Sequence, residues 1–122
     1  MSATVQPVVI TPDLDRSLQF YTALFGAVEH LRIPEDGPTF YVGLTIGNGE
    51  IGLASEAGVD VTAAPRILIS VEVADVDGLL DQVEPAGGKL LGPPTDMPWG
   101  QRVAHIQDPD GNPLNLTQPL QP

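Results

Sequence analysis

Residues 13–26 read DLDRSLQFYTALFG, and this stretch is the strongest indication of the fold because a shorter version of it recurs later in the chain. Each copy begins with an aspartate, Asp13 or Asp75, whose carboxylate can accept hydrogen bonds from the free amides of a helix N-terminus. Gly26 and the segment 85–88 are suited to ending the two helices. Apolar residues follow at helical spacing: Leu14, Leu18, Tyr21, Leu24 and Phe25 in the first copy, and Val76, Leu79, Leu80 and Val83 in the second.

Strand-like runs surround both predicted helices in the same order. A run rich in β-branched residues precedes each helix, at 5–11 and at 66–73. Further runs follow, at 28–33, 39–46 and 50–54 in the first half and at 89–91, 102–107 and 114–117 in the second. Asn48-Gly49 and the segment 108–112 are turn signals between strands. Each half is therefore predicted to be β-α-β-β-β.

The two halves predict a single domain of the α+β class. A chain of 122 residues is long enough for one core but too short for two independent ones. A half of this size does not easily cover both faces of its own sheet. We therefore expect two βαβββ modules, 5–54 and 66–118, to form one curved mixed sheet with helices outside and a cavity inside. The segment 55–65 would link them.

The alternation of side chains along each strand predicts which residues face that cavity. The apolar row of the strand at 66–73 should meet the helices, which leaves Ser70 and Glu72 on the cavity side. Tyr41, His105 and Asn115 are placed on the cavity side by the same reasoning. The residues expected to face the helices are Phe40, Val42, Leu44 and Ile46, then Ile67, Ile69, Val71 and Val73, and finally Leu114 and Leu116. Thr45 and Thr117 are expected on the cavity side.

The composition narrows the range of partners. The formal net charge is −11, which disfavours nucleic acid because phosphate binding needs a cationic surface. The acidic surface serves solubility or attracts a cationic ligand. No apolar run is long enough to cross a membrane, and residues 1–6 do not resemble a signal peptide, so we expect a cytoplasmic protein. The absence of cysteine removes disulfides and thiolate chemistry.

Two motifs in this order resemble a known family. The segment 13–21 with Leu24-Phe25-Gly26, and the segments 92–100 and 108–113 in the second half, resemble the glyoxalase, bleomycin-resistance and extradiol-dioxygenase proteins. This is the vicinal oxygen chelate superfamily. The resemblance covers nearly the whole chain, and it implies the paired βαβββ fold. It also implies a homodimer with ligand sites near the subunit boundary.

The resemblance further implies four metal-ligand positions, which fall on Gln6, near Gly52, on Leu68 and on Asn115. Gln6 is compatible with a divalent metal. Leu68 and Gly52 have no donor atom in their side chains, and Asn115 offers only a neutral oxygen where a carboxylate is usual. If the hairpin shifts, Glu50 or Glu56 would supply an acid. We therefore expect no bound metal, and the alternative is a divalent metal that uses Gln6.

Seven residues are the candidate ligand contacts: Gln6, Tyr41, Ser70, Glu72, Trp99, His105 and Asn115. Glu72 would form charge-assisted hydrogen bonds with a cationic ligand, unless it is a solvated residue at the rim of the sheet. His105 is either an acid/base group or an exposed strand histidine, and His30 reads as a surface residue. Trp99 and Tyr41 could form aromatic walls, and Trp99 could instead close a dimer.

Three functional hypotheses follow. The first is a metal-independent protein that sequesters a small molecule, as bleomycin-resistance proteins do, and confers antibiotic resistance by affinity rather than by catalysis. The second is a metal-dependent glyoxalase-like lyase or isomerase, or a dioxygenase-like enzyme, with Gln6 as one ligand. The third is a dimeric regulatory or scaffold domain in which the cavity has closed. We assign no catalytic residue under the first hypothesis.

Overall fold

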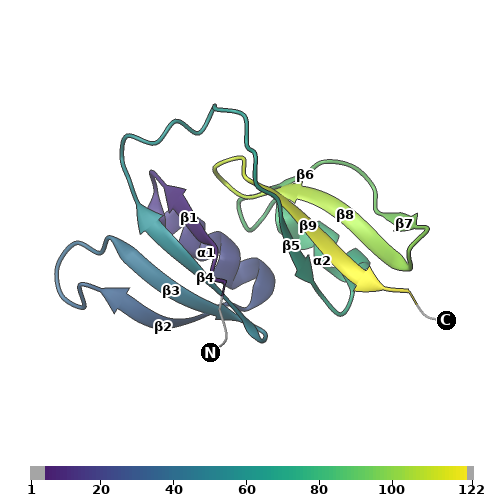
Figure 1. Ribbon diagram of the computed structural model, residues 1–122, viewed down its shortest axis with the longest axis horizontal. Helices are drawn as coiled ribbons and strands as arrows, with labels where there is room; N and C mark the ends of the chain where they lie inside the picture. The colour runs from purple at the N-terminus through teal and green to yellow at the C-terminus, as the bar shows by residue number, and fades with distance from the viewer. Residues whose placement is uncertain (1–4, 121–122) are drawn as a thin grey trace. The chain divides into compact units, whose positions relative to one another are not determined.

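The computed structural model describes residues 5–120 and divides into two compact units between Val61 and Thr62 (Figure 1). Each unit contains one helix and one sheet, as the repeated sequence pattern predicts. The units are described separately below as unit 1 and unit 2, and the assembly of both modules into one domain stays a prediction. Residues 1–4, which entered the argument about the N-terminus, lie outside the described residues.

Unit 1 is a four-stranded mixed sheet with one helix. Its elements are β1 (Val8–Thr11), α1 (Leu14–Phe25), β2 (Val28–Ile33), β3 (Tyr41–Ile46) and β4 (Gly49–Ser55). The strand order is β1-β4-β3-β2, with β1 parallel to β4 and the other pairs antiparallel. The β-α-β-β-β order predicted for the first half is therefore confirmed.

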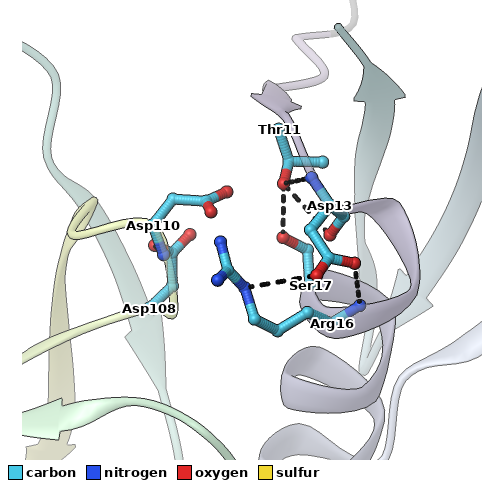
Figure 2. A network of polar contacts seen from close by, with 6 residues as sticks. All are labelled: Thr11, Asp13, Arg16, Ser17, Asp108 and Asp110. Atoms are coloured by element: carbon cyan, nitrogen blue, oxygen red, sulfur yellow. Dashed lines mark hydrogen bonds and ion pairs between the residues drawn. The ribbon is translucent and has the colours of Figure 1, made fainter. Parts of the chain in front are cut away.

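The start of α1 is held by polar contacts with the end of β1. Asp13 caps the helix, since its side chain accepts a hydrogen bond from the Arg16 amide at 3.1 Å. Thr11 is fully buried, and its hydroxyl accepts hydrogen bonds from the Asp13 amide at 3.1 Å and from the Ser17 hydroxyl at 2.9 Å (Figure 2). The other end of α1 closes at Gly26, which adopts the left-handed conformation with φ of 66°. Both predicted ends of this helix are correct.

The core of unit 1 lies between α1 and one face of its sheet. Val42 and Leu44 of β3 are buried there, as the alternation predicts. Phe40 is an exception: it precedes β3, and its side chain is 56% exposed. Its backbone amide donates to Ile33 and its carbonyl accepts from Ser55, so the residue is fixed through its backbone while its ring points to solvent. The prediction that Phe40 packs toward the helix is wrong.

Unit 2 repeats this architecture with one difference. Its elements are β5 (Ile69–Glu72), α2 (Val76–Val83), β6 (Lys89–Leu90), β7 (Thr95–Met97), β8 (Gln101–Gln107) and β9 (Pro113–Pro119). The strand order is β5-β9-β8, and two short strands share the other edge of β8. Strand β6 pairs with the end of β8, and strand β7 pairs with the start of β8. Gly92, Pro93 and Pro94 lie between these two short strands, so the edge strand is interrupted where prolines have no amide to donate. Strand β7 was missed by the sequence prediction for this reason.

Side-chain contacts fix the ends of α2 and β8. Asp75 caps α2 by accepting from the Gly78 amide at 3.2 Å. Arg102 of β8 donates to Asp96 at 2.8 Å and to Asp77 at 3.0 Å, and these hydrogen bonds raise the pKa of its guanidinium. The turn at 108–112 is closed by Asp108, whose carboxylate accepts from the amides of Asp110 and Asn112. The hairpin turn predicted here is confirmed.

Strand β5 begins three residues later than predicted. Ile67 is 78% exposed and precedes the strand, so its placement in the row that packs on the helix is wrong. The pairing of β5 with β9 starts at Ile69 opposite Leu114, and one step earlier Leu68 would meet Pro113, which has no amide hydrogen.

In residues 5–120, neither helix is long and apolar enough to cross a membrane.

Candidate ligand-binding faces

In each unit, the sheet face opposite the helix is called the open face. Residues paired directly across neighbouring strands share a face of the sheet. In unit 1 the row Val8, Gly52 and Gly43 crosses β1, β4 and β3 on the open face. The neighbouring row, Val9, Leu53 and Val42, is buried on the helix side.

Tyr41 lies over Gly52 on the open face of unit 1. A Cβ atom at Gly52 would meet the Tyr41 hydroxyl and would stand only 2.8 Å from two carbons of its ring. The Tyr41 hydroxyl also accepts a long hydrogen bond, 3.5 Å, from the Gln6 side-chain amide. The structure therefore brings two predicted site residues, Gln6 and Tyr41, together above a glycine.

His30 lies over the second glycine of the same row. A Cβ atom at Gly43 would be 3.0 Å from Cε1 of the His30 ring, and Nε2 of that ring is 3.1 Å from the Glu50 carboxylate. The pairing of β2 with β3 shifts between Glu29 and Leu31, which makes His30 the extra residue of a bulge. Bulges redirect a side chain, and this one directs the imidazole onto the open face.

The sequence prediction treated His30 as a surface residue and missed this position. The available signal was the pair of glycines inside adjacent strands, because a strand-interior glycine often marks the close approach of another group. Gly43 and Gly52 are direct partners, so the space above them is continuous on one face. Two rings, His30 and Tyr41, fill that space.

The open face of unit 2 carries four predicted site residues. Ser70, Asn115 and His105 form a directly paired row across β5, β9 and β8, and Glu72 lies two residues after Ser70 on the same face. Nδ1 of His105 is 2.6 Å from the side-chain oxygen of Asn115. Register thus places the four residues on the face that the alternation predicts, and their part in ligand binding stays a prediction.

Trp99 does not join this group. It lies in the turn between β7 and β8, is 68% exposed, and donates from its indole nitrogen to Gln101 at 2.8 Å. Gln101 and His105 are four residues apart on β8, which corresponds to about 13 Å at the usual rise of a strand. Trp99 therefore contributes to a different part of unit 2.

Residues 4–116 match the family model described as the Glyoxalase/Bleomycin resistance protein/Dioxygenase superfamily. The chain belongs to this superfamily. A probable lactoylglutathione lyase of Synechocystis sp. is 32% identical over 87% of this chain and 87% of its own length. An uncharacterized protein of Mycobacterium bovis is 27% identical over 95% of this chain and 83% of its own.

A solved structure from the same superfamily has the same fold. The enzyme from Burkholderia phytofirmans superposes with a TM-score of 0.80 at 22% identity, over 94% of this chain and 97% of that one. The superfamily fold with two βαβββ modules, expected from the sequence motifs, is therefore confirmed.

The register within the two modules shows that the four positions implied by the resemblance as metal ligands correspond in pairs. Val8 pairs with Gly52 in unit 1 as Ser70 pairs with Asn115 in unit 2, so Gly52 and Asn115 are equivalent. Gln6 lies two residues before Val8, and Leu68 lies two residues before Ser70, so Gln6 and Leu68 are equivalent as well. In this register Glu50 lies opposite Thr45, two residues before Gly52, and its carboxylate contacts His30.

These positions do not fit a divalent metal. Gly52 has no side chain and is covered by Tyr41, Leu68 is a hydrocarbon, and Asn115 is hydrogen-bonded to His105. Gln6 is the one remaining donor, and a single neutral amide oxygen does not replace imidazole and carboxylate ligands. Across residues 5–120, no group of three or more His, Cys, Asp and Glu side chains is placed to hold a metal ion.

Proposed function

We propose that this protein binds a small molecule on its open sheet faces without a metal, as a sequestering protein of the bleomycin-resistance kind. The observation that carries this proposal is the position of Tyr41. Its ring occupies the space into which a carboxylate ligand at position 52 would have to extend. Where the superfamily would coordinate a metal, this chain presents a phenol and an amide.

The groups on the open faces are suited to hydrogen bonding. Tyr41 and Gln6 offer a hydroxyl and an amide, and Ser70, His105 and Glu72 offer a hydroxyl, an imidazole and an exposed carboxylate. A carboxylate such as Glu72 forms strong charge-assisted bonds with a cation. The net charge of −11 favours the approach of a cationic ligand in addition. A homodimer and a role in antibiotic resistance belong to the same proposal.

A metal-dependent glyoxalase-like activity is the second candidate. It is supported by the 32% identity to a probable lactoylglutathione lyase. His30 and Glu50 also provide an imidazole and a carboxylate 3.1 Å apart, which are the donor types that such metals prefer. A third and fourth donor would have to join them. Metal binding distinguishes this candidate from the first.

The contribution of Glu72 can be tested once a ligand is found by a thermal-shift screen of glycopeptide-type antibiotics, thiol conjugates and metal ions. In calorimetric titration with EDTA present, Glu72→Gln is expected to weaken a cationic ligand about tenfold because a charge-assisted hydrogen bond is lost. Glu84→Gln makes the same charge change at the end of α2, away from the open face, and should leave affinity unchanged. Equal affinities for wild type and Glu72→Gln would remove Glu72 from the site.

A further inference from the structure

We propose that Asn115 fixes the tautomer of His105, so that Nε2 of this ring is a hydrogen-bond acceptor for a ligand that presents an N–H or O–H group. The proposal rests on ligand binding at the open face of unit 2. Asn115 occupies the position of a metal ligand in the superfamily. Here it acts as a positioning residue for an imidazole instead.

The geometry determines which nitrogen carries the proton. The side-chain oxygen of Asn115 lies 2.6 Å from Nδ1 of His105, and an amide oxygen can only accept a hydrogen bond. We therefore assign the donor role in this contact to Nδ1. A neutral imidazole has one N–H group, so the other nitrogen, Nε2, keeps its lone pair.

The location of the ring makes that lone pair accessible. His105 is exposed on β8, and Asn115 lies beside it on the central strand β9. Ser70 flanks Asn115 on the opposite side, on β5. A ligand lying across this row would meet an acceptor at His105 and a hydroxyl at Ser70. The row therefore suits ligands with hydrogen-bond donors, such as an ammonium group, better than carboxylates.

Unit 1 has an imidazole at the equivalent place, but this ring contacts its partner through Nε2 rather than Nδ1. Gly43 pairs with Gly52 as His105 pairs with Asn115, so Gly43 is the equivalent of His105. The ring of His30 fills the space above Gly43, and its Nε2 lies 3.1 Å from the Glu50 carboxylate. A carboxylate accepts, so a neutral His30 donates from Nε2 and its Nδ1 keeps the lone pair.

The chain contains two histidines, and they are expected to hold opposite tautomers. Nitrogen-15 NMR of the imidazole rings in the intact protein reads this directly at about pH 9, above the usual titration range of histidine. His105 should show a protonated Nδ1 and His30 a protonated Nε2. Asn115→Leu should shift His105 toward a mixture of tautomers, whereas Asn115→Asp, which keeps an acceptor, should restore the Nδ1–H form. Ser70→Ala should change neither ring.

A second measurement tests the role of Nε2 with simple probes. Titration with benzylammonium should move the Nε2 signal of His105 in the wild type, and benzoate should not. Asn115→Leu should weaken the benzylammonium response about tenfold. A protonated Nε2 in wild-type His105, or an equal response to both probes, would overturn the inference. The tautomer is read without metal or ligand. A wrong tautomer would therefore refute this inference without bearing on metal-independent binding.

Discussion

Gly52→Ala is expected to lower the free energy of unfolding by about 1–3 kcal/mol, because the new methyl group overlaps the Tyr41 ring. The ring has to move away from Gly52, and the hydrogen bond from Gln6 to its hydroxyl is then lost. Urea denaturation of the purified variant measures the change. The size of the effect reports how firmly Tyr41 is held over the glycine.

A rescue experiment separates this overlap from a general cost of alanine in a strand. Removing the ring with Tyr41→Ala should relieve most of the penalty, so the double variant should show a favourable coupling of about 1–3 kcal/mol. Gly49→Ala is the matched control in the same strand, because a Cβ there would meet its nearest neighbour, the Ile46 carbonyl oxygen, at an ordinary 3.6 Å. A loss at Gly52 that persists in the absence of the Tyr41 ring would contradict the account.

Phe20→Ala should cost about 3–5 kcal/mol of stability, the range for removing a buried aromatic ring. Phe20 is fully buried in unit 1, with ring centroids 4.9 Å from Tyr21 and 6.3 Å from Phe25 in edge-to-face geometry. Both partner rings lie on α1, so the deletion removes aromatic contacts within the buried part of that helix. Thermal and urea unfolding should both record the loss.

Phe40→Ala removes the same group from a position outside the core and serves as the control. Its ring is 56% exposed, so the expected change in the free energy of unfolding is within about 0.5 kcal/mol. A cost at Phe40 comparable to that at Phe20 would restore the original prediction that this ring packs against the helix, and would show that the burial described for unit 1 is wrong.

The helices and most strands could be predicted because local signals specify them. Asp13, Asp75 and Gly26 act within one turn of a helix, and the structure shows each in its expected cap. The buried faces of β3 and β9 follow from alternation alone, since a strand inside a sheet has only two faces. The family motifs added membership of the superfamily, which the family match confirms.

The errors have a common cause, which is that pairing between strands is not a local property. Ile67 continues an apolar alternation, yet the pairing of β5 with β9 begins only at Ile69, because Pro113 would lie opposite Leu68. His30 reaches the open face through a bulge that depends on the pairing of β2 with β3. The hydrogen bond between His105 and Asn115 likewise arises from the register of β8 and β9. Sequence alternation predicted the face of His105 and Asn115, but not the hydrogen bond between them, and it did not predict the positions of Ile67 and His30.

The most direct test of metal-independent binding is a calorimetric titration of the purified, chelator-treated protein with Zn²⁺ and Ni²⁺, together with elemental analysis of the protein as isolated. Gln6, Gly52, Leu68 and Asn115 do not provide a ligand set, so we predict neither a stoichiometric metal in the isolated protein nor a saturable site in the titration. One equivalent of metal that binds in this titration, and that is lost when Gln6 is replaced by alanine, would contradict the proposal and favour a glyoxalase-like enzyme.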